Sequence, residues 1–191
     1  MKYIRLIAWS AVFVLSAVLI WSVLSKQETK FTKFGSDFNL VRTDGTSVSG
    51  NDFRGRPHLV FFGFTNCPEI CPTTLFEATG WLETLGPLAD NLDVYFITVD
   101  PERDTPEFLK SYLTSFDKRI IGLSGSVEEI DKATKSYHVY YKKVKLDDDD
   151  YTMDHTASVF LMKADGSFMG TIAYQENEDT IIKKLKRLLK K

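Results

Sequence analysis

The chain has 191 residues, of which 43% are apolar, enough for one membrane segment and one globular domain. Without Lys2 and Arg5, which precede a long apolar stretch, its 24 basic residues fall to 22 against 26 acidic ones. The remaining chain therefore carries a net charge of about −4. This balance argues against nucleic-acid binding, because that function needs a clearly positive surface.

The N-terminal part contains a candidate membrane span. Residues 6–24 carry no charged side chain and would form a helix of about 28 Å, long enough to cross the apolar core of a bilayer. Lys2 and Arg5 precede it, which predicts that the short N-terminus stays in the cytoplasm. Trp9 and Trp21 lie near its two ends, where interfacial aromatic residues are favoured.

A cleaved signal peptide is the alternative explanation of this segment. Such a peptide has a shorter apolar core and a small-x-small cleavage site, whereas Leu24 occupies that position here. We therefore expect residues 1–25 to be a cytoplasmic N-terminus and an uncleaved transmembrane anchor. Residues 26–36 would be a polar tether, and residues 37–191 a domain on the outer face of a bacterial cytoplasmic membrane.

The first element of the domain is a predicted β-hairpin over residues 40–48, with Asp44 and Gly45 in its turn. Strands are predicted from short apolar runs at residues 58–64, 94–99, 120–123 and 157–162. Residues 139–146 are predicted to be extended, and a turn at Asp165 and Gly166 leads into a further strand at residues 168–173.

Helices are predicted between these strands at residues 73–88, 106–116 and 126–136, and a basic helix closes the chain. Thr105 is a predicted N-cap with Pro106 at the first helical position. Ser126 and Glu129 match a capping box. The four acids at residues 147–150 are expected in a solvated loop tip.

This order of elements predicts an α/β fold, because alternating strands and helices form a mixed sheet flanked by helices on both faces. A dithiol that follows the first core strand and opens a helix is typical of a thioredoxin-like topology. The predicted fold is therefore a thioredoxin-like mixed sheet flanked by helices, with an N-terminal β-hairpin and an N-terminal transmembrane helix.

Two cysteines, Cys67 and Cys71, lie in the run GFTNCPEICPTT, and the chain has no others. At the start of a helix their Cα atoms would lie about 6 Å apart, which permits a disulfide or a shared metal ion. A helix N-terminus favours the thiolate, which both chemistries require. A purely structural disulfide is less favoured, because closing so small a loop restricts the unfolded chain little.

Two sulfurs are an incomplete site for most metals, so a third ligand is expected. His58 begins a buried strand and His138 lies in an aromatic-rich segment, which favours structural roles for both. His155 follows Asp154 in a predicted loop directly before the strand at residues 157–162. In a thioredoxin-like fold that loop faces the dithiol. On this ground alone, His155 is as well explained as an ordinary loop residue as it is as a metal ligand.

A Cys/Cys/His set suits a soft ion. Copper(I) accepts two or three ligands and prefers thiolate. Zinc usually takes four, so a zinc site would also need water or a carboxylate such as Asp154 or Glu69. Because an oxidised cysteine pair cannot bind metal, the redox state and the metal affinity of this site are linked.

Three sequence motifs resemble those of the Sco/SenC family of copper-binding assembly factors and occur in the same order as in that family: GRPHLVFFGFTNCPEICPTTL, VDPERDTPEFLKSY and DHTASVFLMKADGSF. The resemblance runs from about residue 37 to the C-terminus. It implies a thioredoxin-like domain, usually tethered to a membrane. Such proteins deliver copper to, or reduce the cysteines of, the dinuclear copper site in subunit II of cytochrome c oxidase. The resemblance also implies copper, as Cu(I), Cu(II) or both, with Cys67, Cys71 and His155 as metal ligands.

The chain departs from the family pattern at two positions. Glu69 stands between the cysteines where many members have Asp, and Asn66 stands where many have His. Glu69 keeps the carboxylate with one more methylene, which leaves an auxiliary role for this acid open. Asp100, Arg103 and Asp104 also match the family, and we interpret them as a turn and a helix cap.

Three functions are weighed on these grounds. We favour a metallochaperone, which binds one copper ion and passes it to its partner by ligand exchange, over an enzymatic function. A thiol-disulfide oxidoreductase that reduces the partner's copper-ligand cysteines, with Cys67 and Cys71 as the redox pair, is the alternative. A peroxidase-like reductase is the third and least favoured.

Overall fold

The computed structural model describes residues 34–147 and 150–190, with four isolated positions nearer the N-terminus. Contacts divide the chain into two units, Met1–Phe31 and Thr32–Lys191. Apart from those isolated positions, the predicted transmembrane segment at residues 6–24 lies outside the described residues. Among the described residues, none of the helices has both the length and the apolar character needed to cross a membrane.

In the described part of the second unit, seven strands form one sheet in the order β2-β1-β5-β4-β3-β8-β9. The neighbours β3, β4 and β5 are parallel, whereas β1, β2, β8 and β9 pair antiparallel. The strands are β1 Asn39–Arg42, β2 Ser47–Ser49, β3 His58–Gly63, β4 Asp93–Thr98, β5 Ile120–Ser124, β8 Val159–Met162 and β9 Phe168–Ile172. The predicted mixed sheet and its N-terminal hairpin are confirmed.

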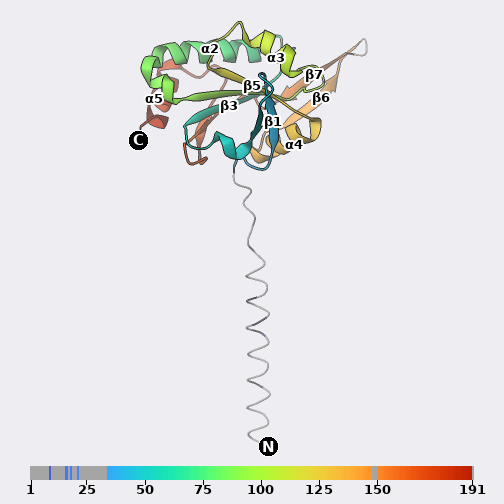
Figure 1. Cartoon of the computed structure of the whole chain (residues 1–191), viewed down its shortest axis with the longest axis vertical. Coiled ribbons are helices and arrows are strands. Elements are labelled where there is room, and N and C mark those ends of the chain that lie inside the picture. Colours follow the sequence, from blue (N-terminus) through green and yellow to red (C-terminus); the bar gives the residue numbers. More distant parts are fainter. Residues whose placement is uncertain are drawn as a thin grey trace, which may run out of the picture. The chain divides into compact units, whose positions relative to one another are not determined.

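Helices cover both faces of this sheet. They are α2 Ile70–Leu85, α3 Pro106–Leu113, α4 Val127–Ser136 and α5 Glu178–Leu188, with 3₁₀ turns η1 Gly50–Phe53 and η2 Gly86–Asn91. Figure 1 shows α2 and α3 above the strands and α4 on the opposite side. In addition, α2 contacts α5, α3 packs on β5, and α4 packs on β1.

The centre of the fold is β3, whose six residues are all buried. It pairs with β4 on one side and β8 on the other, so both of its faces and both of its edges are covered. A continuous apolar strand fits this position, since each buried Leu, Val or Phe side chain contributes about 1.5–3 kcal/mol. At the start of the described part, Phe34 stacks on Phe168 with ring centroids 4.9 Å apart.

Several helix boundaries differ from prediction. α2 begins at Ile70 instead of residue 73, which places Cys71 within its first turn, and α3 ends at Leu113 instead of residue 116. Ser126 caps α4 by accepting from the N–H of Glu129 at 3.3 Å. The Glu129 carboxylate does not close the predicted capping box. It accepts from the N–H of Asn39 at 2.6 Å and so ties α4 to β1.

The sequence-based prediction missed one strand. β6 Tyr141–Lys145 and β7 Tyr151–His155 form a separate antiparallel pair. β7 has one buried residue, Met153, so it lacks the alternation that indicates a strand. His155 was predicted in a loop, but it is the last residue of β7 and pairs with Tyr141.

Two glycines with open space around them provide a matched test of backbone conformation. Nothing lies within 4 Å of a Cβ added at Gly80, inside α2, or at Gly45, whose φ is +87°. Gly80→Ala should raise the free energy of unfolding by about 1 kcal/mol through helix propensity. Gly45→Ala should lower it by about 1–2 kcal/mol through its left-handed backbone. Urea denaturation measures both, and changes of the same sign would contradict this account.

Candidate metal centre

Three side chains from distant parts of the chain meet at one end of the sheet. Cys67 lies in the loop after β3, Cys71 in the first turn of α2, and His155 at the end of β7. Their ligand atoms all lie within 4.8 Å of one another. The three residues singled out by the sequence therefore come together. His58 does not join them, and its buried ring lies 3.0 Å from the carbonyl oxygen of Arg56.

The loop conformation brings Cys71 against the end of β3. The N–H of Cys71 lies 3.4 Å from the sulfur of Cys67, and the Cys71 sulfur lies 3.5 Å from Nε2 of His155. A Cβ at Gly63 would lie 2.9 Å from the Cys71 sulfur and 2.7 Å from the ring of Phe96. A glycine at the end of β3 thus gives the buried sulfur its space.

The ring of His155 is held with one nitrogen toward the sulfurs. Its Nδ1 lies 3.1 Å from the carbonyl oxygen of Thr156. A carbonyl can only accept, so this contact assigns the proton to Nδ1 and leaves the lone pair on Nε2. The edges of Phe64 and Phe61 pack around the ring, with centroids 5.7 and 6.3 Å away. Nε2 is therefore prepared to bind a metal.

The two cysteines differ in environment and share one proton. A hydrogen bond from the Cys71 thiol lowers the pKa of Cys67 most. Partial burial opposes this effect, while His155 and the backbone N–H groups of Cys71 and Glu69 add to it. The same hydrogen bond, together with burial and the charge of Cys67, raises the pKa of Cys71. Cys67 is thus the thiolate and Cys71 the thiol. Metal binding through both sulfurs would release the Cys71 proton.

A shallow cavity of about 260 Å³ opens onto this group. Cys67 and His155 line it and are partly exposed, whereas Cys71 is fully buried. Glu69 and Asp154 also line the cavity, but neither carboxylate belongs to the close Cys/Cys/His group among the described residues. The arrangement therefore favours a three-ligand ion over a four-ligand zinc site.

Two further features escaped the sequence-based prediction, one near the site and one at the opposite end of β3. The hydroxyl of Tyr112 is buried without a hydrogen-bond partner among the described residues. Burial raises the pKa of this tyrosine. A larger cavity of about 450 Å³ lies where β3 begins and β8 has ended, beside Arg56 and Lys163, and contains none of the candidate ligands.

The predicted turn and helix cap at residues 100–105 are present. The N–H groups of Arg103 and Asp104 donate to the carbonyl oxygen of Asp100 at 3.2 and 2.9 Å. Thr105 caps α3 by accepting from the N–H of Phe108 at 3.3 Å. The side chains of Asp100, Arg103 and Asp104 take no part in that cap and contact other segments instead.

Fold and site define a thioredoxin-like protein with a candidate Cys/Cys/His metal centre. A family model described as SCO1/SenC matches residues 26–190, and the chain belongs to this family. A SCO2-like protein of Rickettsia felis is 40% identical over 139 residues, which are 72% of this chain and 68% of that protein.

Solved structures agree with this assignment. Bradyrhizobium japonicum ScoI with copper bound is 46% identical, with a TM-score of 0.75, over 81% of this chain and 99% of that one. BsSco, described as a Sco-family cytochrome c oxidase assembly protein with a disulfide switch, is 28% identical, with a TM-score of 0.65, over 81% and 92% of the two chains. The predicted Sco/SenC membership and thioredoxin-like fold are confirmed.

The shared proton leads to a prediction about thiol reactivity. Because the thiolate is the nucleophile, Cys67 in the folded chain should react with iodoacetamide at a pH well below the ordinary midpoint of about 8.5. Cys71→Ala removes the hydrogen-bond donor and should move that midpoint upward. Alkylation rates followed by mass spectrometry across pH test both expectations. The urea-unfolded chain is the control, and an identical midpoint in folded and unfolded chains would contradict the assignment.

Proposed function

We propose that this chain binds copper through Cys67, Cys71 and His155 and delivers it during assembly of cytochrome c oxidase. The recipient in this proposal is the dinuclear copper centre of subunit II. The observation that carries it is the close Cys/Cys/His group in a family whose 46% identical member has been solved with copper bound. Two thiolates and an imidazole suit both oxidation states of copper.

The burial of the three donors supports delivery as well as binding. Cys71 is fully buried, while Cys67 and His155 face the open cavity. Incoming thiolates of a partner can therefore approach from the side of Cys67 and His155 and replace the donors one at a time. Copper is then the cargo, and Cys71 would be the last donor to release it.

The proposal includes the placement of the chain. Residues 1–25 would anchor it in a bacterial cytoplasmic membrane, residues 26–36 would form the tether, and residues 37–191 would be the copper-binding domain on the outer face. The uncharged run at residues 6–24 and the basic residues before it support this placement.

A thiol-disulfide oxidoreductase is the second candidate, supported by the thiolate of Cys67 beside the thiol of Cys71. The Cys67 thiolate would attack a disulfide of the partner, and the first partner thiolate would leave. Cys71 would then pass its proton to that leaving sulfur and attack Cys67. The partner would gain two electrons and leave as one thiol and one thiolate, and this chain would become a Cys67–Cys71 disulfide, to be reduced again by another dithiol.

Anaerobic copper titration of the reduced full chain in detergent tests the copper site. His155→Ala should lower the copper affinity on the order of a hundredfold. Even the loss of a residue that only hydrogen-bonds to a metal ligand typically lowers metal affinity about tenfold to a hundredfold. Cys67→Ser and Cys71→Ser should each lower it further. His138→Ala, at an exposed histidine outside the Cys/Cys/His group, is the matched control and should leave copper affinity unchanged. Unchanged affinity and coordination in His155→Ala would contradict the three-ligand site.

The same variants separate the two candidates. Exchange with a model disulfide should collapse in Cys67→Ser and Cys71→Ser and persist in His155→Ala. A chain that exchanges rapidly but binds copper no better than His155→Ala would favour the oxidoreductase.

A further inference from the structure

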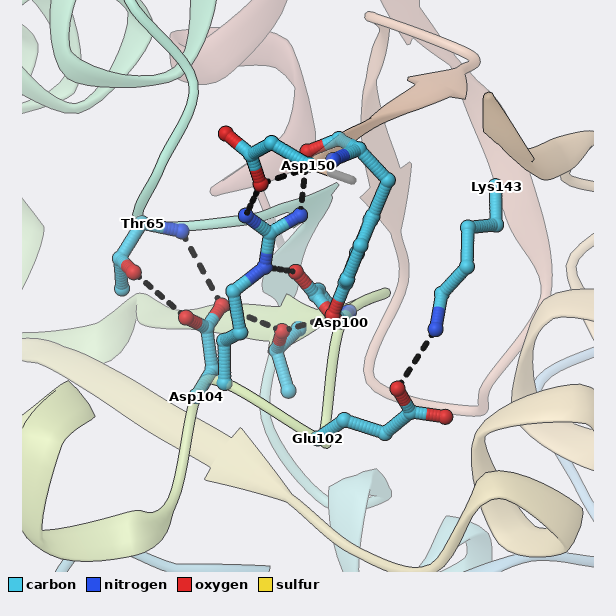
Figure 2. A network of polar contacts seen from close by, with 9 residues as sticks. Thr65, Asp100, Glu102, Asp104, Lys143 and Asp150 are labelled. Atoms are coloured by element: carbon cyan, nitrogen blue, oxygen red, sulfur yellow. Dashed lines mark hydrogen bonds and ion pairs between the residues drawn. The ribbon is translucent and has the colours of Figure 1, made fainter. Parts of the chain in front are cut away.

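The carboxylate of Asp104 holds the loop that carries the cysteines. Asp104 is fully buried, and its carboxylate accepts from the N–H of Thr65 at 3.0 Å and from the Thr65 hydroxyl (Figure 2). The hydroxyl of Thr98 donates to the same carboxylate at 2.6 Å. Since Thr65 lies two residues before Cys67, Asp104 fixes the start of the cysteine loop to the end of β4.

The guanidinium of Arg103 holds the hairpin that carries His155. It stacks over the ring of Tyr151, 3.4 Å from the centroid, and donates to the carbonyl oxygen of Tyr151 at 2.5 Å. Its Nε donates to Asp100 at 2.7 Å, and the Tyr151 hydroxyl donates to the other oxygen of that carboxylate at 2.9 Å. Tyr151 begins β7, and His155 ends it.

Both anchors belong to one short turn. The hydroxyl of Thr98 donates to the carboxylate of Asp104 and accepts from the backbone N–H of Asp100 at 2.9 Å, so Thr98 links the Asp104 carboxylate to the backbone of Asp100. Asp100 and Asp104 are 1% and 0% exposed. Buried carboxylates are costly unless charges or hydrogen bonds compensate them, and a simple turn does not require them.

We propose that the turn of residues 100–104 positions the metal donors. Asp104 sets the cysteine loop, while Arg103 and Asp100 set Tyr151 and, through β7, His155. The inference rests on the proposed copper site. Donors held in place before the ion arrives bind it more tightly, because less conformational freedom is lost on binding. Arg103 is then a positioning residue for His155, which it does not touch.

A double-mutant cycle tests this role in the reduced full chain in detergent. Arg103→Lys keeps the charge but loses the planar fork and the stacking on Tyr151. This variant should lower copper affinity about tenfold, which is the lower end of the effect seen when residues that orient metal ligands are replaced. In the His155→Ala background the same change should have little effect. The electron paramagnetic resonance spectrum of Cu(II) bound to Arg103→Lys should also shift toward that of His155→Ala.

Arg119→Lys is the matched control. Arg119 also pairs with a carboxylate, Asp117, at 2.6 Å, and its side chain is 29% exposed against 26% for Arg103. This variant should leave affinity and spectrum unchanged. If Arg103→Lys fails to fold by urea denaturation, Tyr151→Phe replaces it. That variant removes the bond to Asp100 alone and should lower affinity on the order of threefold.

The outcomes separate the inference from the function on which it rests. Equal losses from the Arg103 or Tyr151 change in both backgrounds would overturn the positioning role while leaving the copper site intact. No loss in His155→Ala itself would overturn the three-ligand site, and the positioning role with it. Dependence of the loss on the presence of His155 would support both.

Discussion

The burial of one sulfur governs the chemistry of this site. Cys71 lies in the first turn of α2, against the end of β3, where Gly63 leaves the space that its sulfur occupies. The hydrogen bond to Cys67, together with the burial of the sulfur, raises the pKa of Cys71, so this sulfur keeps its proton. Its thiol donates to Cys67, which is the partly exposed thiolate. One constraint on packing thus produces two cysteines with different roles, from two residues that the sequence alone does not distinguish.

The direction of the strands places His155, the third donor, near the two cysteines. β8 runs antiparallel to β3, with Val159 opposite Phe61, so the start of β8 lies beside the end of β3. Residues shortly before Val159 must therefore lie near the residues shortly after Gly63. The carboxyl ends of the parallel strands β3 and β4 meet at the same edge, which is where ligands bind in open α/β sheets. The turn of residues 100–104 follows β4 and occupies this edge as well, between the two donor segments.

Continuous apolar runs such as residues 58–64 were sufficient to predict the core strands, because a strand covered on both faces leaves little place for polar residues. The pairing of His155 with the cysteines also followed from topology and motif. Local patterns failed where a residue's partner is distant in sequence. Glu129 matches a capping box locally, yet its carboxylate bonds to Asn39, 90 residues away. Arg103 lies in an ordinary turn sequence, and its contact with Tyr151 spans 48 residues. β7 was missed because its single buried residue gives no periodicity.

His155 is the residue that separates the two candidate functions. A dithiol that only exchanges disulfides needs a thiolate, a nearby thiol and access for its partner, and Cys67 and Cys71 supply these without a histidine. Here the ring is also fixed by Thr156, Phe61 and Phe64, with Nε2 3.5 Å from the Cys71 sulfur. An oriented lone pair beside two sulfurs is the third donor that an ion held by those sulfurs would need. Oxidation of the pair would remove both sulfurs as metal donors, so the close Cys/Cys/His geometry supports metal binding by the reduced chain.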